Sequence, residues 1–173
     1  MPSMIKIAAM GLGLVTMAAC TSPDRFGGSD GADANANAQI AAPALTGAND
    51  PNSPQFFTQT IGDRVLFNVD QATLTDQGKA ILDGQARWLT ANADYLAIIE
   101  GHADEQGTRQ YNIGLGFRRS NAVREYLVSK GVPAARLRVT SYGKERPIKV
   151  CSSESCYAQN RRAVTVISIA SLS

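Results

Sequence analysis

The sequence predicts a single domain of the α/β or α+β class, in which two main helices pack a mixed, partly parallel sheet of four strands. Its 173 residues are enough for one domain and hardly for two. By their periodicity, the apolar segments follow one another in the order β-α-β-α-β-loop-β. Strands that alternate with helices of this length imply right-handed βαβ units, and such units make at least part of the sheet parallel.

The first part of the domain is expected to form a strand, a helix and a second strand. Residues 64–69 (RVLFNV) are apolar and β-branched enough for a strand. Thr75 can cap the helix that follows, whose apolar residues recur at helical spacing. These residues are Ile81, Leu82, Trp88 and Leu89. Residues 95–99 (YLAII) form a short, continuous apolar run, as expected of a strand that is buried on both faces.

The second part is expected to form a helix and two more strands after the loop 101–107, which has the sequence GHADEQG. The apolar stripe of this helix consists of Leu115, Val123, Tyr126 and Leu127. Gly131 and Pro133 end the helix. Residues 137–139 alternate apolar and polar side chains in a third strand. A loop with two cysteines separates it from the fourth strand, residues 163–169 (AVTVISI).

The N-terminus predicts export from the cytoplasm. A short basic start, residues 1–6, precedes the apolar run 7–19, which is too short to span a bilayer, so residues 1–19 are expected to be a signal peptide. Small residues precede Cys20, and this arrangement resembles the lipobox of bacterial lipoproteins, in which the cysteine is acylated. The alternative is an ordinary signal peptide followed by a chance cysteine. By resemblance to the sorting rule of enteric lipoproteins, Thr21 in place of Asp favours the outer membrane.

A change in composition separates this N-terminus from the folded domain. Residues 27–54 contain 19 Ala, Gly, Asn or Pro among 28 residues, and only Ile40 and Leu45 are large aliphatics. Such a segment buries too little apolar surface to offset the entropy lost on ordering it. We therefore expect residues 20–54 to be a flexible tether behind the acylated cysteine, and the folded domain to span residues 55–173. A random coil of this length holds its ends roughly 30 Å apart.

The charge balance and the cysteines exclude some partners and leave others open. The 17 Lys and Arg residues nearly balance 15 Asp and Glu, and there is no basic run, so we expect no nucleic-acid partner. In an exported protein, Cys151 and Cys156 favour a disulfide. A zinc site that uses both thiolates is the alternative. The only histidine, His102, is about 50 residues away, however, and no third cysteine is free for it.

The loop 101–107 contains that histidine and two carboxylates, but the patterns required for catalysis are missing. A hydrolytic nucleophile needs a general base held by a third group, and a catalytic zinc ion needs three protein ligands. His102 and Asp104 supply two ligands, and Asp104 and Glu105 are adjacent, which rarely places two carboxylates across a substrate. The glycines lack the Lys-Ser/Thr of a phosphate-binding loop. We therefore expect no enzyme activity, no cofactor and no metal.

The same loop is better suited to holding a zwitterionic ligand. It follows a buried strand and opens a helix, so its backbone N–H groups favour an anionic group. Asp104 offers a fixed negative charge to an ammonium group, and Arg118 or Arg119 on the following helix could meet a carboxylate with two hydrogen bonds. In the alternative interpretation, Asp104 only caps the helix and both arginines are solvated.

Four long motifs resemble those of a known family. They are EGHADEQGTRQYNIGLGFRRSNAVREYL (residues 100–127), VLFNVD (65–70), KGVPAARLRVTSYGKERP (130–147) and NRRAV (160–164). In sequence and in order they are similar to the motifs of the OmpA-like peptidoglycan-binding domains, and the resemblance covers nearly all of the expected folded domain. It implies the OmpA-like fold. It also implies a ligand, the meso-diaminopimelate side chain of the peptidoglycan stem peptide, which carries both an ammonium and a carboxylate.

The resemblance also implies which residues form the binding site. Carried over to this sequence, Asp104 is the acidic anchor of the family's G-H-x-D motif, and Arg119 is the arginine of its L-S-x-x-R-A motif. The residues that would line the pocket are Phe67, Asn68 and Leu115. The residues that would support the loop are Gly101, Gly107 and His102, the last through its ring nitrogens.

The sequence departs from the family pattern within the second helix. Gly116 and Ser120 stand where the family prefers Ser and Ala, and Gly116 is expected to destabilise the helix by roughly 1 kcal/mol. Asn68 stands where many relatives have Asp. The run 160–162 matches the family's N-R-R motif, and we expect its role to be mostly structural.

These features predict an outer-membrane lipoprotein whose domain faces the periplasm and binds peptidoglycan without cleaving it. The resemblance adds a role in the Tol system, with TolB and other Tol proteins as partners. Two alternatives remain. One is a tethered peptidoglycan-modifying enzyme, and the other is an envelope lipoprotein whose partners are proteins only.

Overall fold

A computed structural model describes residues 47–169 of the chain. The expected signal peptide (residues 1–19), Cys20 and most of the expected tether lie outside the described residues. Within the described range, no helix is both long enough and apolar enough to cross a membrane.

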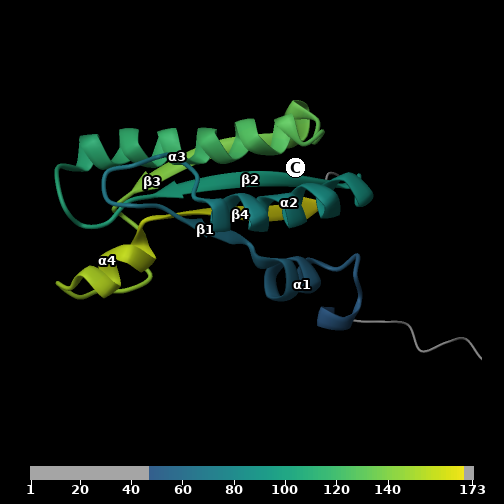
Figure 1. The fold of residues 1–173 in the computed structure, drawn as a ribbon, viewed down its shortest axis with the longest axis horizontal. Helices are drawn as coiled ribbons and strands as arrows, with labels where there is room; N and C mark the ends of the chain where they lie inside the picture. Colours follow the sequence, from purple (N-terminus) through teal and green to yellow (C-terminus); the bar gives the residue numbers. More distant parts are fainter. Residues whose placement is uncertain (1–46, 170–173) are drawn as a thin grey trace, which may run out of the picture. The chain divides into compact units, whose positions relative to one another are not determined.

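One four-stranded sheet runs through the described part of the chain (Figure 1). Its strands are β1 (Arg64–Leu66), β2 (Tyr95–His102), β3 (Leu137–Gly143) and β4 (Arg162–Ile169), in the spatial order β1-β4-β2-β3. β2 and β3 are parallel, whereas β4 is antiparallel to both β1 and β2. The predicted mixed, partly parallel sheet is therefore confirmed. The sequence pattern did not predict that the last strand would lie between β1 and β2.

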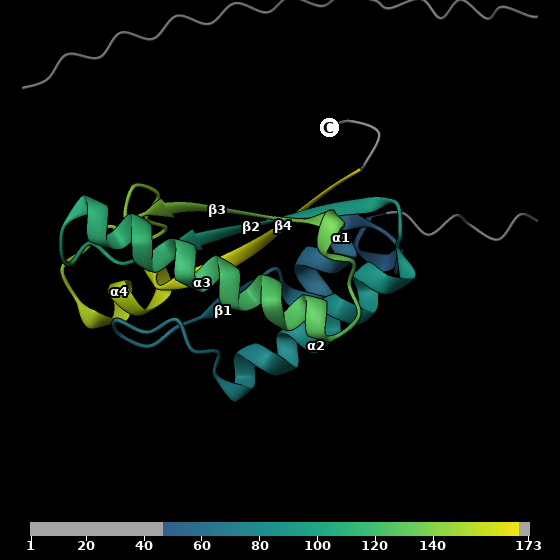
Figure 2. The same cartoon turned by 90° about the horizontal axis from the view of Figure 1, so that it is seen from above.

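Two long helices lie on the same side of this sheet (Figure 2). α2 spans Asp76–Ala91 and begins where predicted, because the Thr75 hydroxyl accepts a hydrogen bond from the Gly78 amide at 3.0 Å. α3 spans Arg109–Ser129, and Thr108 caps it in the same way. The prediction of two main helices packed on one sheet is confirmed.

An apolar core fills the space between the two helices and the sheet. Its most deeply buried members, each at most 1% exposed, are Phe57, Val65, Leu82, Leu89, Ala97, Ile99, Val123 and Leu127. The ring of Trp88 lies 4.9 Å from that of Phe57 and 5.1 Å from that of Tyr95, centre to centre. Burying one large apolar side chain stabilises a fold by roughly 1.5–3 kcal/mol, so this core is the main source of stability.

Several short helical segments have no counterpart in the sequence prediction. They are η1 (Gly47–Asn49), α1 (Pro54–Phe56), η2 (Phe57–Gly62), η3 (Ala134–Arg136) and α4 (Glu154–Asn160). The first three precede the sheet. Trp88 Nε1 donates a hydrogen bond to the Pro51 carbonyl at 2.7 Å, and Ser53 is 8% exposed and caps α1. Residues 47–54, which composition assigned to the tether, therefore pack against the folded unit.

α3 and β2 approach each other closely where two glycines face each other. A Cβ atom on Gly101 would lie 1.8 Å from the carbonyl oxygen of Gly116, and one on Gly116 would lie 2.4 Å from Ser141 Oγ. There is no room for a side chain at either position. Gly116 therefore allows close packing of α3 on the sheet, which accounts for a residue that lowers helix propensity in mid-helix.

Candidate functional site

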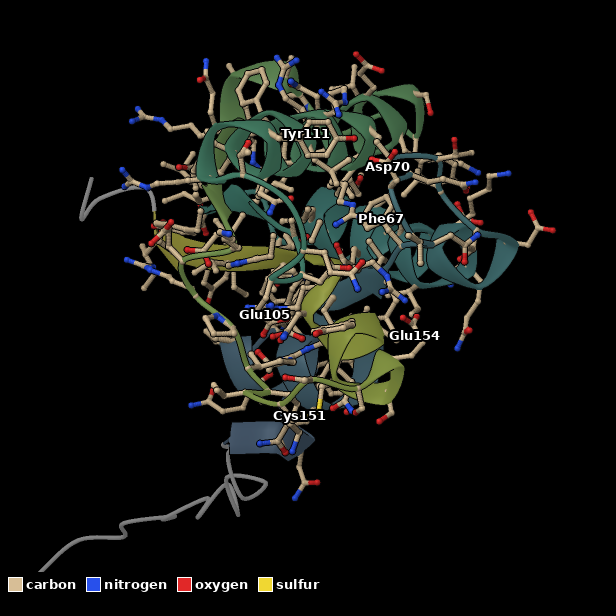
Figure 3. The ribbon with its side chains drawn as sticks, turned by 90° about the vertical axis from the view of Figure 1, so that its left-hand side faces the viewer. Phe67, Asp70, Glu105, Tyr111, Cys151 and Glu154 are labelled. Carbon is tan, nitrogen blue, oxygen red and sulfur yellow. A yellow bond between two sulfur atoms is a disulfide. The ribbon has the colours of Figure 1, made fainter. Side chains whose placement is uncertain are left out.

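A pocket opens beside the loop 101–107, at the carboxyl ends of the parallel strands β2 and β3. Its volume is about 230 Å³. The residues that line it are Val69, Asp70, Asp104, Gln106, Gly107, Tyr111, Asn112 and Leu115. Figure 3 views the domain from this end and shows Asp70 and Tyr111 close together. The pocket is thus built from the β1–α2 connection, the loop and the first turns of α3.

Hydrogen bonds from two neighbouring segments hold the loop in place. Asn112 Nδ2 donates to the Gln106 carbonyl at 2.7 Å, and Lys144 Nζ donates to the Gly107 carbonyl at 2.7 Å. Gly107 has a φ of 88°, a conformation that favours glycine. The loop backbone is therefore fixed from both sides before any ligand binds.

Asp104 lines the pocket, but it already has a partner. Arg161 Nη1 donates to Asp104 Oδ2 at 3.1 Å, and neither side chain is more than 10% exposed. Arg161 Nη2 donates to Glu154, whose side chain is 66% exposed. Burial lowers the pKa of Arg161, but hydrogen bonds to Glu154 and Asp104 outweigh burial, so the net pKa is raised. Asp104 thus belongs to a chain of three charges that is negative overall, with Arg161 in the middle.

Arg119 is completely buried and does not line the pocket. Its three nitrogens donate to backbone carbonyls: Nε to Gln71 at 2.8 Å, Nη1 to His102 at 2.8 Å and Nη2 to Asn68 at 3.1 Å. Burial lowers the pKa of Arg119 to about 10, although the charge of Asp104 opposes this shift. Arg119 therefore ties the end of β2 to the β1–α2 connection. The structure does not place its guanidinium on the pocket surface beside Asp104.

Of the three other residues expected to line the pocket, only Leu115 does so. Phe67 is 3% exposed, and its ring centre lies 5.2 Å from the guanidinium carbon of Arg119. Asn68 gives its carbonyl to Arg119, while its side-chain nitrogen lies 3.4 Å from Gln71 Oε1 at the surface. Phe67 and Asn68 therefore support Arg119 and contribute no pocket wall.

His102 does not support the loop through its ring nitrogens as predicted. Among the described residues, neither nitrogen makes a hydrogen bond, although Nε2 lies 3.6 Å from Glu100 Oε2. Burial lowers the pKa of His102 to about 4, and the charges of Arg162 and Arg146 act in the same direction, so the imidazole is neutral at neutral pH. Its ring stacks on that of Tyr142 at 5.6 Å. The support that His102 gives comes from this packing and from its backbone carbonyl.

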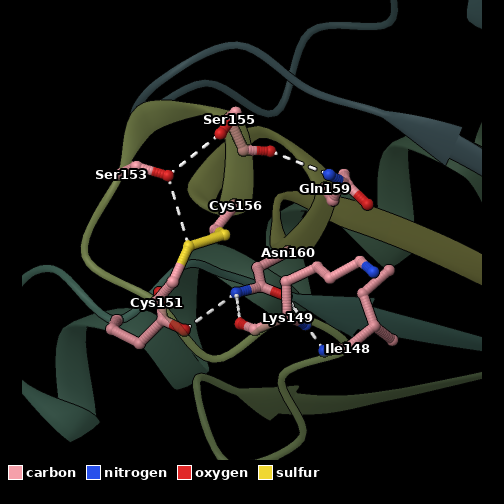
Figure 4. The surroundings of a disulfide bond; sticks show 9 residues. Ile148, Lys149, Cys151, Ser153, Ser155, Cys156, Gln159 and Asn160 are labelled. Atoms are coloured by element: carbon pink, nitrogen blue, oxygen red, sulfur yellow. Dashed lines mark hydrogen bonds between the residues drawn. A yellow bond between two sulfur atoms is a disulfide. The ribbon is translucent and has the colours of Figure 1, made fainter.

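The structure joins Cys151 and Cys156 in a disulfide at the start of α4 (Figure 4). Asn160, at the other end of α4, donates from Nδ2 to the Lys149 carbonyl and to Glu105 Oε1, both at 2.8 Å. α4 is thereby tied to the loop 101–107. In the part of the chain that the structure describes, no group of three or more His, Cys, Asp or Glu residues is arranged to hold a metal ion.

Comparisons with known proteins agree with this architecture. The model of the OmpA family matches residues 66–161, which include the loop, the pocket and α4. The chain belongs to the OmpA family. A relative in this family, the peptidoglycan-associated lipoprotein of Rhizobium meliloti (strain 1021), is 54% identical over 121 residues, which is 70% of this chain and 69% of the relative.

Two further OmpA-family relatives extend the comparison. The peptidoglycan-associated lipoprotein of Pseudomonas putida is 37% identical over 157 residues, 91% of this chain and 93% of the relative. The crystal structure of the peptidoglycan-associated lipoprotein from Burkholderia pseudomallei is similar with a TM-score of 0.62 and 38% identity, covering 70% of this chain and 98% of that one. The OmpA-like fold predicted from the motifs is therefore confirmed.

The sequence prediction missed five residues that line the pocket of this OmpA-family domain, and two of them, Asp70 and Tyr111, bond to each other. The other three are Val69, Gln106 and Asn112. The Tyr111 hydroxyl donates a hydrogen bond to the Asp70 carboxylate, and this bond raises the pKa of Tyr111. Asp70 has a φ of 56°, the left-handed region that Asp tolerates better than most residues. An Asp directly after an apolar run is a signal for a turn, and this signal could have indicated Asp70. Tyr111 gave no signal, because one aromatic residue in a first helical turn is common.

Proposed function

We propose that this chain is an outer-membrane lipoprotein that binds peptidoglycan through the meso-diaminopimelate of the stem peptide and so anchors the membrane to the cell wall. The names of its relatives, peptidoglycan-associated lipoprotein, support both the ligand and the lipid anchor. The similarity to the Pseudomonas putida relative covers 91% of the chain and so extends beyond the folded domain. On this proposal residues 1–19 are removed, Cys20 is acylated, and the domain faces the periplasm.

The observation that carries the proposal is the pocket beside the loop 101–107, because two carboxylates line it. Asp70 and Asp104 suit the ammonium group of diaminopimelate. The carboxylate of the ligand would be met by loop N–H groups. Arg119 contributes from beneath the pocket, where its hydrogen bonds to three backbone carbonyls hold the surrounding segments together.

The first experiment separates binding from cleavage. A soluble form that begins at Thr21 is mixed with purified sacculi and centrifuged. We expect the protein to sediment with the sacculi and no muropeptides to appear in the supernatant. Release of soluble fragments would instead support the alternative of a tethered peptidoglycan-modifying enzyme.

The second experiment tests the site. Asp104→Asn keeps the size of the side chain and removes its charge, so we expect sacculus binding to weaken about tenfold or more, as for loss of a charge-assisted hydrogen bond. Asp94→Asn makes the same charge change at an exposed turn between α2 and β2 and is expected to bind like the wild type. If Asp104→Asn, shown to be folded by circular dichroism, binds like Asp94→Asn, the assigned site is wrong. That result would favour a lipoprotein whose partners are proteins only.

The lipid anchor is tested separately. Cys20→Ala is expected to move the protein from the membrane fraction to the soluble periplasmic fraction, because the acyl chains hold it to the bilayer. Sacculus binding by the purified variant should be unchanged. Retention of Cys20→Ala in the membrane would contradict acylation at this residue.

The proposal includes TolB and other Tol proteins as partners, on the strength of the family resemblance. If TolB docks on the pocket face, a soluble muropeptide that contains meso-diaminopimelate should displace it. A pull-down with purified TolB measures this. Retention of TolB at saturating muropeptide would place its contact elsewhere.

A further inference from the structure

The charge of the pocket depends on a residue that does not line it. Asp104 is paired with Arg161, and Arg161 is paired in turn with Glu154, which lies outside the pocket wall. Because Asp104 and Arg161 are both buried, their charges act on each other with little screening. With Asp104 as its only acidic partner, Arg161 would cancel most of the charge that Asp104 offers to an ammonium group. Glu154 adds the second negative charge.

The position of Arg161 leaves it little freedom to turn away. Its Nε donates to the Phe67 carbonyl at 3.3 Å, in addition to the contacts of its two terminal nitrogens. The side chain is 6% exposed. A guanidinium fixed in this way divides its charge between Asp104 and Glu154, so a change at Glu154 is transmitted to Asp104.

Glu154 lies within the short ring that the disulfide closes. Cys151 and Cys156, which Figure 4 shows joined, lie on either side of Glu154 in the sequence. Cys151 Sγ lies 3.2 Å from Ser153 Oγ, which lies 2.9 Å from Ser155 Oγ. An exposed ion pair usually contributes little to stability, because holding a long side chain in one conformation costs entropy. A short closed ring limits the backbone freedom that would otherwise be lost on pairing.

We propose that Glu154 is a positioning residue for the ligand pocket. By sharing Arg161 with Asp104 it keeps the pocket negative, and the disulfide between Cys151 and Cys156 keeps it within reach. The inference rests on the proposed function, because the ammonium group that senses this charge belongs to diaminopimelate. When Glu154 is neutral or displaced, Arg161 pairs with Asp104 alone and the affinity for the ligand falls.

The first test changes the charge of Glu154 and keeps its shape. The soluble form is titrated calorimetrically with a muropeptide containing meso-diaminopimelate, at about 0.1 M and about 1 M salt, where the Debye length is roughly 10 Å and 3 Å. At the lower salt we expect Glu154→Gln to bind about three- to tenfold more weakly, a coupling typical of one charge network. Glu154→Asp should bind close to wild type, and so should the control Asp94→Asn.

The salt dependence distinguishes a charge effect from a structural one. Glu154 is 66% exposed, so its contribution should be screened, and the gap between wild type and Glu154→Gln should nearly close at the higher salt. If Glu154→Gln and Glu154→Asp lose the same affinity for the muropeptide, and lose it equally at both salt concentrations, Glu154 acts through packing and not through its charge. That result would overturn the inference.

The second test asks whether the disulfide acts through Glu154. The double variant Cys151→Ser/Cys156→Ser should lose as much affinity as Glu154→Gln, and adding Glu154→Gln to it should cost little more. Reduction of the wild type with dithiothreitol should reproduce this loss. Circular dichroism checks that each variant is folded. If the triple variant loses affinity by the product of the two separate fold-losses, the disulfide acts independently of Glu154. Its part in the inference would then be wrong.

The failures of the two proposals can be told apart. If the wild type binds the muropeptide and Glu154→Gln binds equally well at low salt, the inference about Glu154 fails and the proposed function stands. If the wild type binds neither the muropeptide nor sacculi, the proposed function fails, and the inference fails with it.

Discussion

The two ends of the sheet are stabilised in different ways. Where β2 begins, the rings of Phe57, Trp88 and Tyr95 pack against one another. Where β2 ends, beside the loop 101–107, the buried side chains are mostly polar or charged. They are His102, Asp104, Asn112, Arg119, Asn160, Arg161 and Arg162. In Figure 1 the apolar end carries α1 and the polar end carries α4.

This difference separates stability from recognition. Apolar packing depends little on direction, so the apolar end contributes mainly to the free energy of unfolding. Buried charges are costly to desolvate, and they are kept only where hydrogen bonds fix them, as Arg119 is fixed by three carbonyls. The polar end therefore holds charged groups at set positions, as a site for a zwitterionic ligand requires.

The largest expected effect comes from the apolar end. Trp88→Ala removes the centre of the aromatic cluster and its hydrogen bond to Pro51, and should lower the free energy of unfolding by about 3–5 kcal/mol. Urea denaturation measures this loss. Sacculus binding per folded molecule should be unchanged, because the pocket lies at the other end of β2. A weaker affinity of the folded fraction would show that the two ends are coupled.

A smaller loss of stability, combined with a loss of binding, is expected at the polar end. Arg119→Leu leaves the carbonyls of Asn68, Gln71 and His102 without their hydrogen-bond donor. We therefore expect it to lower the free energy of unfolding by about 2–4 kcal/mol. It should also abolish sacculus binding, because the pocket walls lose their link. Arg118→Leu is the matched control, since Arg118 is exposed, and should change stability by less than about 0.5 kcal/mol. Equal effects of both variants would contradict the buried role of Arg119.

The most gradual expected effect is a pH dependence that originates at the polar end and is spread over the range between pH 6.5 and 4. His102 is neutral in the folded protein down to a pKa of about 4, whereas in the unfolded chain it gains a proton below pH 6.5. Its contribution to stability is therefore complete above pH 6.5 and is lost as the pH falls to 4, with a slope of about 1.4 kcal/mol per pH unit. Urea midpoints across this range, compared with those of His102→Gln, isolate the contribution. Parallel pH profiles for the two proteins would show that His102 does not titrate as described.

Most of the fold could be predicted, because its signals are local. The cap at Thr75, the helical stripes and the strand at 95–99 each depend on neighbours in the sequence, and the structure reproduces them. The expectation that this strand is buried on both faces is wrong, because Ile98 is 36% exposed while Ala97 and Ile99 are buried. The position of β4 could not be predicted, because it depends on pairings across the sheet, such as that of Ile98 with Val166. Residues 47–54 were assigned to the tether for a related reason. Their contact with Trp88 is a single tertiary hydrogen bond that composition does not encode.

The candidate site could be located from the sequence, but the hydrogen bonds and ion pairs within it could not be predicted. Asp104 lines the pocket as expected, whereas the neighbouring Glu105 does not and accepts a hydrogen bond from Asn160. The contacts of Arg119 and Arg161 could not be predicted. Arg119, which was expected to face the ligand, donates to backbone carbonyls beneath the pocket, and Arg161, which was expected to be mostly structural, pairs with Asp104. Sequence spacing does not show which of two buried arginines reaches a given carboxylate.

The most direct test of the account maps the ligand onto the structure. Amide chemical shifts of the soluble form are recorded by NMR during titration with a muropeptide that contains meso-diaminopimelate. We expect the largest changes at residues 69–70, 104–107 and 111–115, which line or flank the pocket. Largest changes instead around Leu66 and Ile148, which line a second groove of about 310 Å³, would contradict the assignment of the pocket beside Asp104.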